Sequence, residues 1–301
     1  MINWLKYKKI YFTVSAILIA VSIYSLVTWG LKLGVDFRGG TIIEYKFANQ
    51  FSTEEVIKEI EEKGLEVTSV QQTGDDTYLF KLPPINTEDK ITIEGVLLNV
   101  TNAEEETDVD ELRFETVGPS VGPELIKKTV YAILIAAGAM LLWIAYQFKS
   151  FKFGVSAILA MFHDSFILIG SFAILGHFMS AEIDFLFVTA LLTTLSFSVH
   201  DTIVVFDRIR EIKKTQGGEM VDVANRALTE TMVRSLNNSF TIAFMLMALL
   251  LLGGTTVKWF AAALLIGTIL GTYSSPFVAT PLLISWDGVG ERIKSIKIMR
   301  K

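Results

Sequence analysis

The chain has 301 residues, 51% of them hydrophobic, with a mean hydropathy of +0.47, which excludes an ordinary soluble domain and indicates an integral membrane protein. It contains no cysteine, so disulfides and thiolate metal sites are excluded. The net charge of −5 is uneven, because residues 34–126 hold 21 acidic and 7 basic side chains. This distribution predicts one acidic soluble module within a basic membrane protein.

The first apolar run, Ile10–Leu31, follows a short basic N-terminus and is long enough to span a membrane as a helix. The alternative is a cleaved signal peptide. The run is long for such a peptide, however, and no small-residue cleavage site follows it. We therefore expect a retained helix within residues 1–33.

Residues 34–127 are polar enough to form a folded α+β domain between the first two membrane helices. Alternating and periodic patterns predict strands at Thr41–Phe47, Val67–Gln72, Thr77–Leu82 and Glu111–Val117, and helices at Ser52–Lys63 and Glu88–Asn99. The resulting order, βαββαβ, is the ferredoxin-like pattern. Gly39 and Gly40 mark a constrained turn at the entrance to this domain and are candidates for its hinge.

Five further apolar runs are expected to span the membrane, at Thr129–Tyr146, Phe153–His177, Ile183–Phe206, Leu236–Leu252 and Trp259–Ile284. A basic connection is expected over Asp207–Arg234, with a short helix at Val221–Met232 lying along the membrane. Residues 128–285 thus complete an α-helical polytopic protein with six transmembrane helices, and residues 286–301 form a basic tail.

Lysine and arginine cluster at the N-terminus, after the second helix, after the fourth helix and in the tail. With six helices, these four segments lie on one side of the membrane, and the positive-inside rule makes that side cytoplasmic. We therefore expect both termini to be cytoplasmic and the ferredoxin-like domain to be extracytoplasmic.

Asp201 lies inside the fourth apolar run, where a carboxylate costs about 2.5–3.5 kcal/mol on insertion scales. Thr194 and Ser198 share its helix face at i, i+4 and i+7 spacing. At 1.5 Å per residue, Asp201 lies roughly 9 Å from the cytoplasmic end of the run. Such a residue is a functional candidate by default, and the alternative is a structural ion pair or hydrogen bond.

Arg234 is the expected partner of Asp201, because the fifth helix begins at a similar depth. Asn237 and Asn238 continue a polar face beyond it. A carboxylate and a guanidinium that approach and separate can bind and release a proton. The alternative is that Arg234 extends to the cytoplasmic surface.

His163 and Asp164 lie deeper, roughly 16 Å into the third helix, and form either a proton relay or a polar helix contact. The pair Gly267 and Gly271 is typical of close helix packing. No phosphate-binding lysine loop, zinc-protease motif or nucleophile elbow occurs in the sequence. We expect no enzymatic activity, no cofactor and no metal, so the energy source is an ion gradient or a partner.

Several motifs together resemble one family, and the resemblance covers nearly the whole chain. They are GVDFRGGT at Gly34–Thr41, VGPSVGPEL at Val117–Leu125, FHDS at Phe162–Ser165, SVHDTIVVFDRIRE at Ser198–Glu211 and RSLNNSFT at Arg234–Thr241. The chain is similar to the SecF family of the bacterial and archaeal secretion machinery, within the resistance–nodulation–division superfamily. It departs from the family at His200, where asparagine is usual and where only histidine can titrate.

The resemblance implies a role in protein export. Family members pair with SecD in a pseudo-symmetric twelve-helix unit beside the SecYEG channel, with YajC as a further partner, in the lipids of the cell membrane. In the family, proton flow through the membrane part is thought to drive movements of the outer domains, and these movements pull the emerging preprotein. We expect no nucleic-acid partner. By resemblance, Asp201 matches the proton-coupling aspartate and Arg234 the membrane arginine. His200, Ser198, Asn237 and Asn238 are candidates for either a proton relay or a polar helix contact.

Two other functions remain open at this stage. In the first alternative, the chain only stabilises SecD and SecYEG, and the Asp201 contact is fixed. In the second, it transports small molecules or lipids. The sequence leaves H⁺ and Na⁺ open as the coupling ion.

Overall fold

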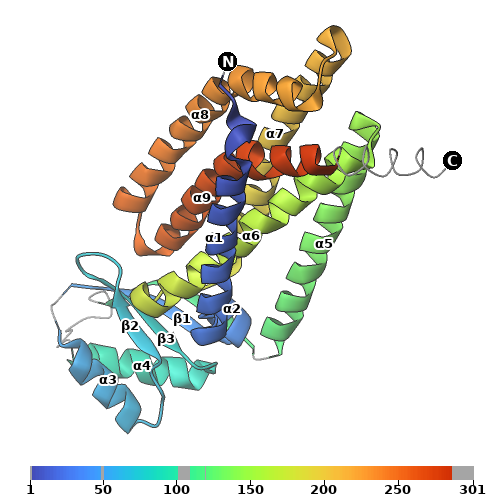
Figure 1. Ribbon diagram of the computed structural model, residues 1–301. Helices are drawn as coiled ribbons and strands as arrows, with labels where there is room; N and C mark the ends of the chain where they lie inside the picture. Colours follow the sequence, from blue (N-terminus) through green and yellow to red (C-terminus); the bar gives the residue numbers. More distant parts are fainter. Residues whose placement is uncertain (1, 49–50, 101–108, 119, 287–301) are drawn as a thin grey trace. The chain divides into compact units, whose positions relative to one another are not determined.

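The computed structural model describes residues 2–48, 51–100, 109–118 and 120–286 (Figure 1). The chain divides into two compact units, the first formed by residues 1–32, 131–253 and 257–301 and the second by residues 33–130 and 254–256. Residues 287–301, which hold most of the predicted basic tail, lie outside the described residues.

Within the described residues, six helices are long and apolar enough to cross a membrane, which confirms the predicted number. They are α1 (Lys8–Thr28, preceded by the 3-10 turn η1, Trp4–Tyr7), α5 (Val121–Phe148), α6 (Phe151–Met179), α7 (Phe185–Gln216), α8 (Met220–Leu252) and α9 (Thr255–Ser274). A π-helix, η3 (Ser275–Ala279), continues α9, and the sixth span reaches Trp286. The helix changes direction near η3 (Figure 1), as expected where Pro276 removes a backbone donor.

The predicted connection over Asp207–Arg234 is wrong, because most of it is helical. Helix α7 continues to Gln216 and α8 begins at Met220, so three residues separate them. The short helix predicted at Val221–Met232 is the start of α8, whose first turns run at an angle to the rest in Figure 1. The apolar run marks only the part of a helix that contacts lipid, and therefore does not mark where the helix ends.

Charged pairs stabilise these helical extensions. Arg208 lies 2.5 Å from Glu211 on its own helix and 2.5 Å from Glu230 on α8. The basic segments also gather at one end of the first unit. There Arg210 donates to the carbonyl of Gln147 at 2.9 Å, and Trp4 donates through Nε1 to Thr229 at 3.0 Å. The N-terminus, the α5–α6 turn and the α7–α8 connection therefore lie at a common end, as the charge pattern predicts.

Burial differs strongly among the six helices. The apolar windows of α6, α7 and α9 are 61%, 56% and 67% buried, whereas those of α1, α5 and α8 are 17%, 11% and 17% buried. Glycines bring the buried helices together. A Cβ on Gly267 of α9 would lie 2.1 Å from Cγ2 of Thr194 on α7, and a Cβ on Gly271 would lie 3.2 Å from Cα of Ser198. The close packing predicted for this glycine pair is confirmed.

The second unit contains a four-stranded antiparallel sheet in the order β2-β3-β1-β4. Its elements are α2 (Val35–Arg38), β1 (Gly40–Phe47), α3 (Thr53–Glu62), β2 (Ser69–Gln72), β3 (Thr77–Leu82), α4 (Thr87–Val100) and β4 (Val109–Val117). The strands and helices predicted from the sequence are confirmed, with ends shifted by a few residues. Ser52 occupies the N-cap position of α3 as expected, although its side chain makes no capping hydrogen bond.

One face of β1 forms the core of this unit. Ile43, Tyr45 and Phe47 alternate inward and pack against Val56 of α3 and Leu97 of α4. The Tyr45 hydroxyl donates to Glu94 at 3.4 Å. Burial, with further contributions from Glu94 and Glu111, raises the pKa of Tyr45 well above its ordinary value.

The turn before β1 depends on glycine. Gly39 and Gly40 have φ values of 79° and 145°, which other residues rarely adopt, and a Cβ on Gly40 would lie 2.7 Å from the carbonyl oxygen of Leu82. The segment just before this turn packs against the second motif of the unit, Val117–Leu125. A Cβ on Gly122 of that motif would lie 2.2 Å from the carbonyl oxygen of Phe37. Both glycine-containing motifs therefore contribute to one backbone packing site.

Candidate functional site

Asp201 lies on the buried face of α7, where Thr194, Ser198 and Asp201 are 7%, 1% and 6% exposed. Its carboxylate accepts hydrogen bonds from the hydroxyl of Ser235 on α8, at 2.7 Å to Oδ1 and 2.6 Å to Oδ2. A buried carboxylate requires such donors, since an unpaired charge away from water is strongly unfavourable. Asp201 thus links α7 to α8.

Arg234 does not form the direct partner expected from the sequence. Its side chain is exposed, and among the described residues it makes no ion pair with Asp201 within 4.0 Å. The physical reason is helical geometry, because consecutive residues point about 100° apart around a helix axis. Ser235 therefore faces α7 while Arg234 points outward. His200, Asn237 and Asn238 are also exposed, so their roles as relay residues stay predictions.

A second buried carboxylate lies on α6. Asp164 is 6% exposed, and its Oδ1 lies 2.9 Å from Nδ1 of His163, which is 8% exposed. Its Oδ2 accepts from Ser198 of α7 at 2.7 Å and from Ser274 of α9 at 2.5 Å. Asp164 thus joins three helices. The sequence predicted either a proton relay or a polar helix contact for His163 and Asp164, without identifying their partners.

The two carboxylates belong to one polar cluster, which we define as His163, Asp164, Ser198, Asp201, Thr202, Ser235, Ser274 and Ser275. Thr202, next to Asp201, lies 2.9 Å from the hydroxyl of Ser275 and donates to the carbonyl of Ser198 at 3.0 Å. Ser274 and Ser275 are the last residue of α9 and the first of the π-helix. π-Helical turns recur at functional sites because they redirect side chains.

The chemistry available to this cluster follows from its side chains. The described residues contain no group of three or more histidine and acidic side chains able to hold a metal ion. The cluster consists of two carboxylates, an imidazole and hydroxyls, and hydroxyls both donate and accept. Such groups can carry protons across a bundle of helices.

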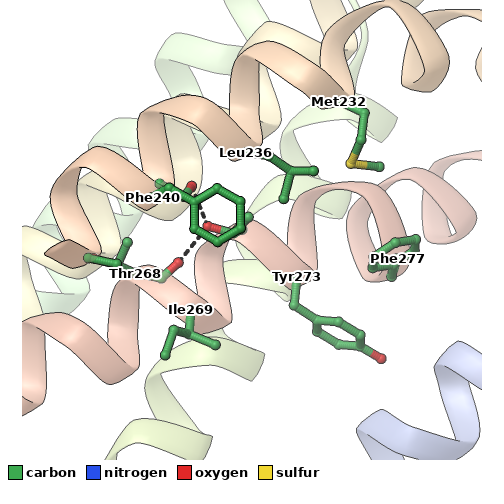
Figure 2. Close-up of a pocket in the computed structure, with 10 residues that line it drawn as sticks. Met232, Leu236, Phe240, Thr268, Ile269, Tyr273 and Phe277 are labelled. Atoms are coloured by element: carbon green, nitrogen blue, oxygen red, sulfur yellow. Dashed lines mark hydrogen bonds between the residues drawn. The ribbon is translucent and has the colours of Figure 1, made fainter.

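An apolar pocket of about 290 Å³ lies between α8 and α9, apart from this cluster (Figure 2). Leu236, Phe240 and Phe277 contribute to its walls, and no charged side chain lines it. Among its polar groups, the Thr272 hydroxyl donates to Ser239 at 2.6 Å. The pocket shares no lining residue with the cluster that holds the two carboxylates.

Sequence reasoning identified Ser198, which donates to Asp164, but missed the other serines of the cluster. Ser235 stands beside the more conspicuous Arg234, and Ser274 and Ser275 precede Pro276 in an otherwise apolar span. The available signal was the adjacent Ser-Ser-Pro sequence, since proline in a membrane helix frees backbone groups that neighbouring hydroxyls satisfy.

The family comparisons agree with the motifs. Residues 98–289 match the family described as "Protein export membrane protein SecD/SecF, C-terminal". The chain belongs to the SecD/SecF family. Residues 24–50 match the "SecD/SecF GG Motif", which contains Gly39 and Gly40. The resemblance drawn from the sequence is confirmed, and a role for this multi-pass membrane protein in protein export follows.

Relatives extend over almost the whole chain. The "Protein translocase subunit SecF" of Thermobaculum terrenum is 40% identical, with 95% of this chain and 94% of the relative covered. The SecF of Vibrio alginolyticus is 35% identical over 94% of this chain and 89% of its own length.

A solved structure matches the fold as well. The crystal structure of SecDF from Thermus, described as a translocon-associated membrane protein, superposes with a TM-score of 0.79 at 31% identity. The match covers 95% of this chain but 39% of that SecDF chain. A second SecDF structure, in a super-membrane-facing form, has a TM-score of 0.71 and is likewise covered to 40%.

Proposed function

We propose that the chain is the SecF subunit of a Sec protein translocase, in which protons passing at Asp201 drive movement of the second unit and thereby promote preprotein export. The observation that carries this proposal is the buried carboxylate of Asp201 between α7 and α8, in a chain of the protein-export family. A carboxylate in a membrane helix is costly and marks an ion path by default.

The proposal includes a setting and partners. The chain spans the cell (cytoplasmic) membrane with both termini in the cytoplasm, in keeping with the gathering of basic segments at one end of the first unit. The second unit is an extracytoplasmic ferredoxin-like domain whose hinge includes Gly39 and Gly40. The partners are SecD, the SecYEG channel and YajC, and the role is non-enzymatic.

Arg234 has a defined part in this mechanism. It precedes Ser235 on α8, so a rotation of α8 by about 100° would exchange the two side chains in front of Asp201. Opposite Ser235, the carboxylate can hold a proton, whereas opposite a guanidinium the charged form is favoured and the proton leaves. The exchange of partners therefore couples proton release to helix movement.

The energy available suits this task. One charge crossing the membrane yields about 2.3 kcal/mol per 100 mV. Moving a two-state domain from 1:99 to 99:1 requires about 5.5 kcal/mol. Two or three protons, together with a pH difference, therefore supply enough free energy to shift the second unit between two positions.

The test is Asp201→Asn, with Asp207→Asn as the matched control, because Asp207 is an exposed carboxylate on the same helix. Membrane vesicles carrying the complete translocase are assayed for preprotein transport with and without a proton gradient. We expect Asp201→Asn to lower the gradient-driven rate by about 100-fold, as for loss of a positioned acid–base group. Asp207→Asn should transport at the wild-type rate.

A structural role is the specific rival, because Ser235 donates to both oxygens of Asp201 and could fix α7 to α8. Under that rival, Asp201→Asn keeps its gradient-driven rate as long as the protein folds, since the amide oxygen still accepts from Ser235. Wild-type gradient-driven transport by Asp201→Asn would refute the proton mechanism. Loss of efflux with normal secretion after deletion of the chain would instead favour small-molecule transport.

A further inference from the structure

We infer that His163 and Asp164 form a second proton-carrying site, joined to Asp201 through the hydroxyls of Ser198, Thr202, Ser274 and Ser275. This inference rests on the proposed function, because it extends the proton path from the α7–α8 contact into the interior of the helix bundle. It also gives the π-helix a part in proton transfer.

The first ground is the degree of burial. Asp164 and His163 are 6% and 8% exposed, in the most buried part of the first unit, where α6, α7 and α9 meet. A contact that served only to hold helices together would be met by neutral hydroxyls, as where Ser25 of α1 donates to the carbonyl of Gly170 at 3.1 Å. A carboxylate and an imidazole at this depth are costly, and such groups mark proton relays.

The second ground is the unpartnered nitrogen of His163. Nδ1 lies 2.9 Å from Asp164, whereas Nε2 is buried and makes no hydrogen bond with the described residues. Buried polar atoms without a partner are rare in native proteins. An imidazole engaged through one nitrogen and open at the other can accept a proton at Nε2 and give up a proton from Nδ1.

The third ground is continuity. Asp164 Oδ2 contacts the hydroxyl of Ser274 at 2.5 Å, and the neighbouring Ser275 hydroxyl lies 2.9 Å from that of Thr202. Thr202 follows Asp201 on α7. Of the two consecutive serines at the α-to-π transition, Ser274 therefore binds the Asp164 carboxylate of α6, and Ser275 contacts Thr202 beside Asp201 on α7.

The transfer step is balanced. A proton from the aqueous side binds Nε2 of neutral His163, and the Nδ1–H bond breaks as the Asp164 Oδ1–H bond forms. Asp164 then loses this proton toward Asp201 as the hydroxyls of Ser274 and Ser275, which contact Asp164 and Thr202, rotate toward each other. Each hydroxyl accepts one proton and donates another, and His163 regains its Nδ1–H form by tautomer exchange before the next transfer. One proton enters and one leaves, with no oxidant or reductant.

Few other charges face the site. Among the described residues, His163 is the titratable side chain that contacts Asp164, and α7 and α9 contribute the hydroxyls of Ser198 and Ser274. Helix α1 packs on α6 through Ser22 and Ser25. Of the charged or titratable groups, His200 of α7 and Arg234 of α8 interact with Asp201 through longer-range electrostatics.

The test uses Asp164→Asn, His163→Gln and Ser274→Ala in vesicles containing the complete translocase. Ser171→Ala and Ser285→Ala are matched controls, because each of these serines bonds a carbonyl of its own helix, at 2.8 Å. Two quantities are measured: the gradient-driven transport rate, and the carboxyl stretching bands in infrared difference spectra of the purified complex between acidic and neutral pH.

We expect Asp164→Asn and His163→Gln to lower the gradient-driven rate by about 100-fold, as for loss of a positioned acid–base group. One carboxyl band should vanish in Asp164→Asn and shift in His163→Gln. Ser274→Ala should slow transport, and both controls should remain at the wild-type rate. If the Asp164 contact were purely structural, Asp164 would contribute no carboxyl band to the difference spectrum between acidic and neutral pH. The spectra of wild type and Asp164→Asn would then be the same.

The outcomes separate the two proposals. If Asp201→Asn is inactive while folded Asp164→Asn and His163→Gln transport at the wild-type rate, the second site is refuted and the proposed function stands. If Asp164→Asn fails to fold, His163→Gln decides, because glutamine keeps a hydrogen bond to Asp164 but cannot pass a proton. Wild-type rate and an unshifted carboxyl band in His163→Gln would then refute the inference.

Discussion

Replacing Gly267 with alanine tests whether α7 and α9 are packed as closely as the structure shows. The added Cβ would lie 2.1 Å from Cγ2, 2.6 Å from Cβ and 3.1 Å from Oγ1 of Thr194. Real side chains essentially never approach so closely, and the neighbour is a β-branched residue on a buried helix face, so the helices must separate. Overpacking of this kind costs about 1–3 kcal/mol.

The assay is reversible unfolding of the purified full-length chain in detergent micelles. Gly138→Ala is the control, since a Cβ there meets nothing within 4 Å, and it should be neutral or stabilising by up to about 1 kcal/mol. Thr194→Gly removes the three side-chain atoms nearest to the added Cβ, so the double variant should be less destabilised than the sum of the two single variants. If Gly267→Ala is as stable as the wild type, the close approach of α7 and α9 is incorrect.

Two further predictions follow from individual contacts. Ser235→Ala should lower stability by about 1–3 kcal/mol, because the Asp201 carboxylate loses its donor, whereas exposed Arg234→Ala should stay within about 0.5 kcal/mol; the reverse order in unfolding assays would contradict the structure. Burial raises the pKa of Tyr45, so the folded chain keeps this proton while the unfolded chain loses it above about pH 10. Stability is therefore present below that pH and falls above it, and Tyr45→Phe should reduce this alkaline decline in unfolding measurements; an unchanged decline would show that Tyr45 ionises normally.

Hydropathy and periodicity predicted the architecture because both reflect burial directly. Tyr45 and Phe47 alternate along a strand that has one buried face, and the six apolar runs become six helices. Helix ends were less predictable. The extension of α7 to Gln216 is stabilised by pairs such as Arg208 with Glu230, which join two helices, and no local pattern specifies that contact.

The sequence predicted the two acids of the candidate site, but of their donors only Ser198. Asp201 and Asp164 stand out because carboxylates are rare in apolar runs. Their partners are serines, which are common in membrane helices, and which serine faces a carboxylate depends on helix rotation. A difference of one residue on α8 separates Ser235, which bonds Asp201, from Arg234, which the sequence favoured on grounds of charge. Pairing opposite charges is a sound rule at surfaces but overlooks hydroxyls that satisfy a buried carboxylate.

The unequal burial of the six helices has a consequence for sequence variation. Helices α6, α7 and α9 bury more than half of their apolar windows, so each substitution there must preserve volume and hydrogen bonding. Helices α1, α5 and α8 bury less than a fifth. On their outward faces, exchange among leucine, isoleucine, valine and phenylalanine changes little within the chain itself. Random mutagenesis of this protein should therefore divide its helices into an intolerant set of three and a permissive set of three, even though all six are apolar enough to cross a membrane.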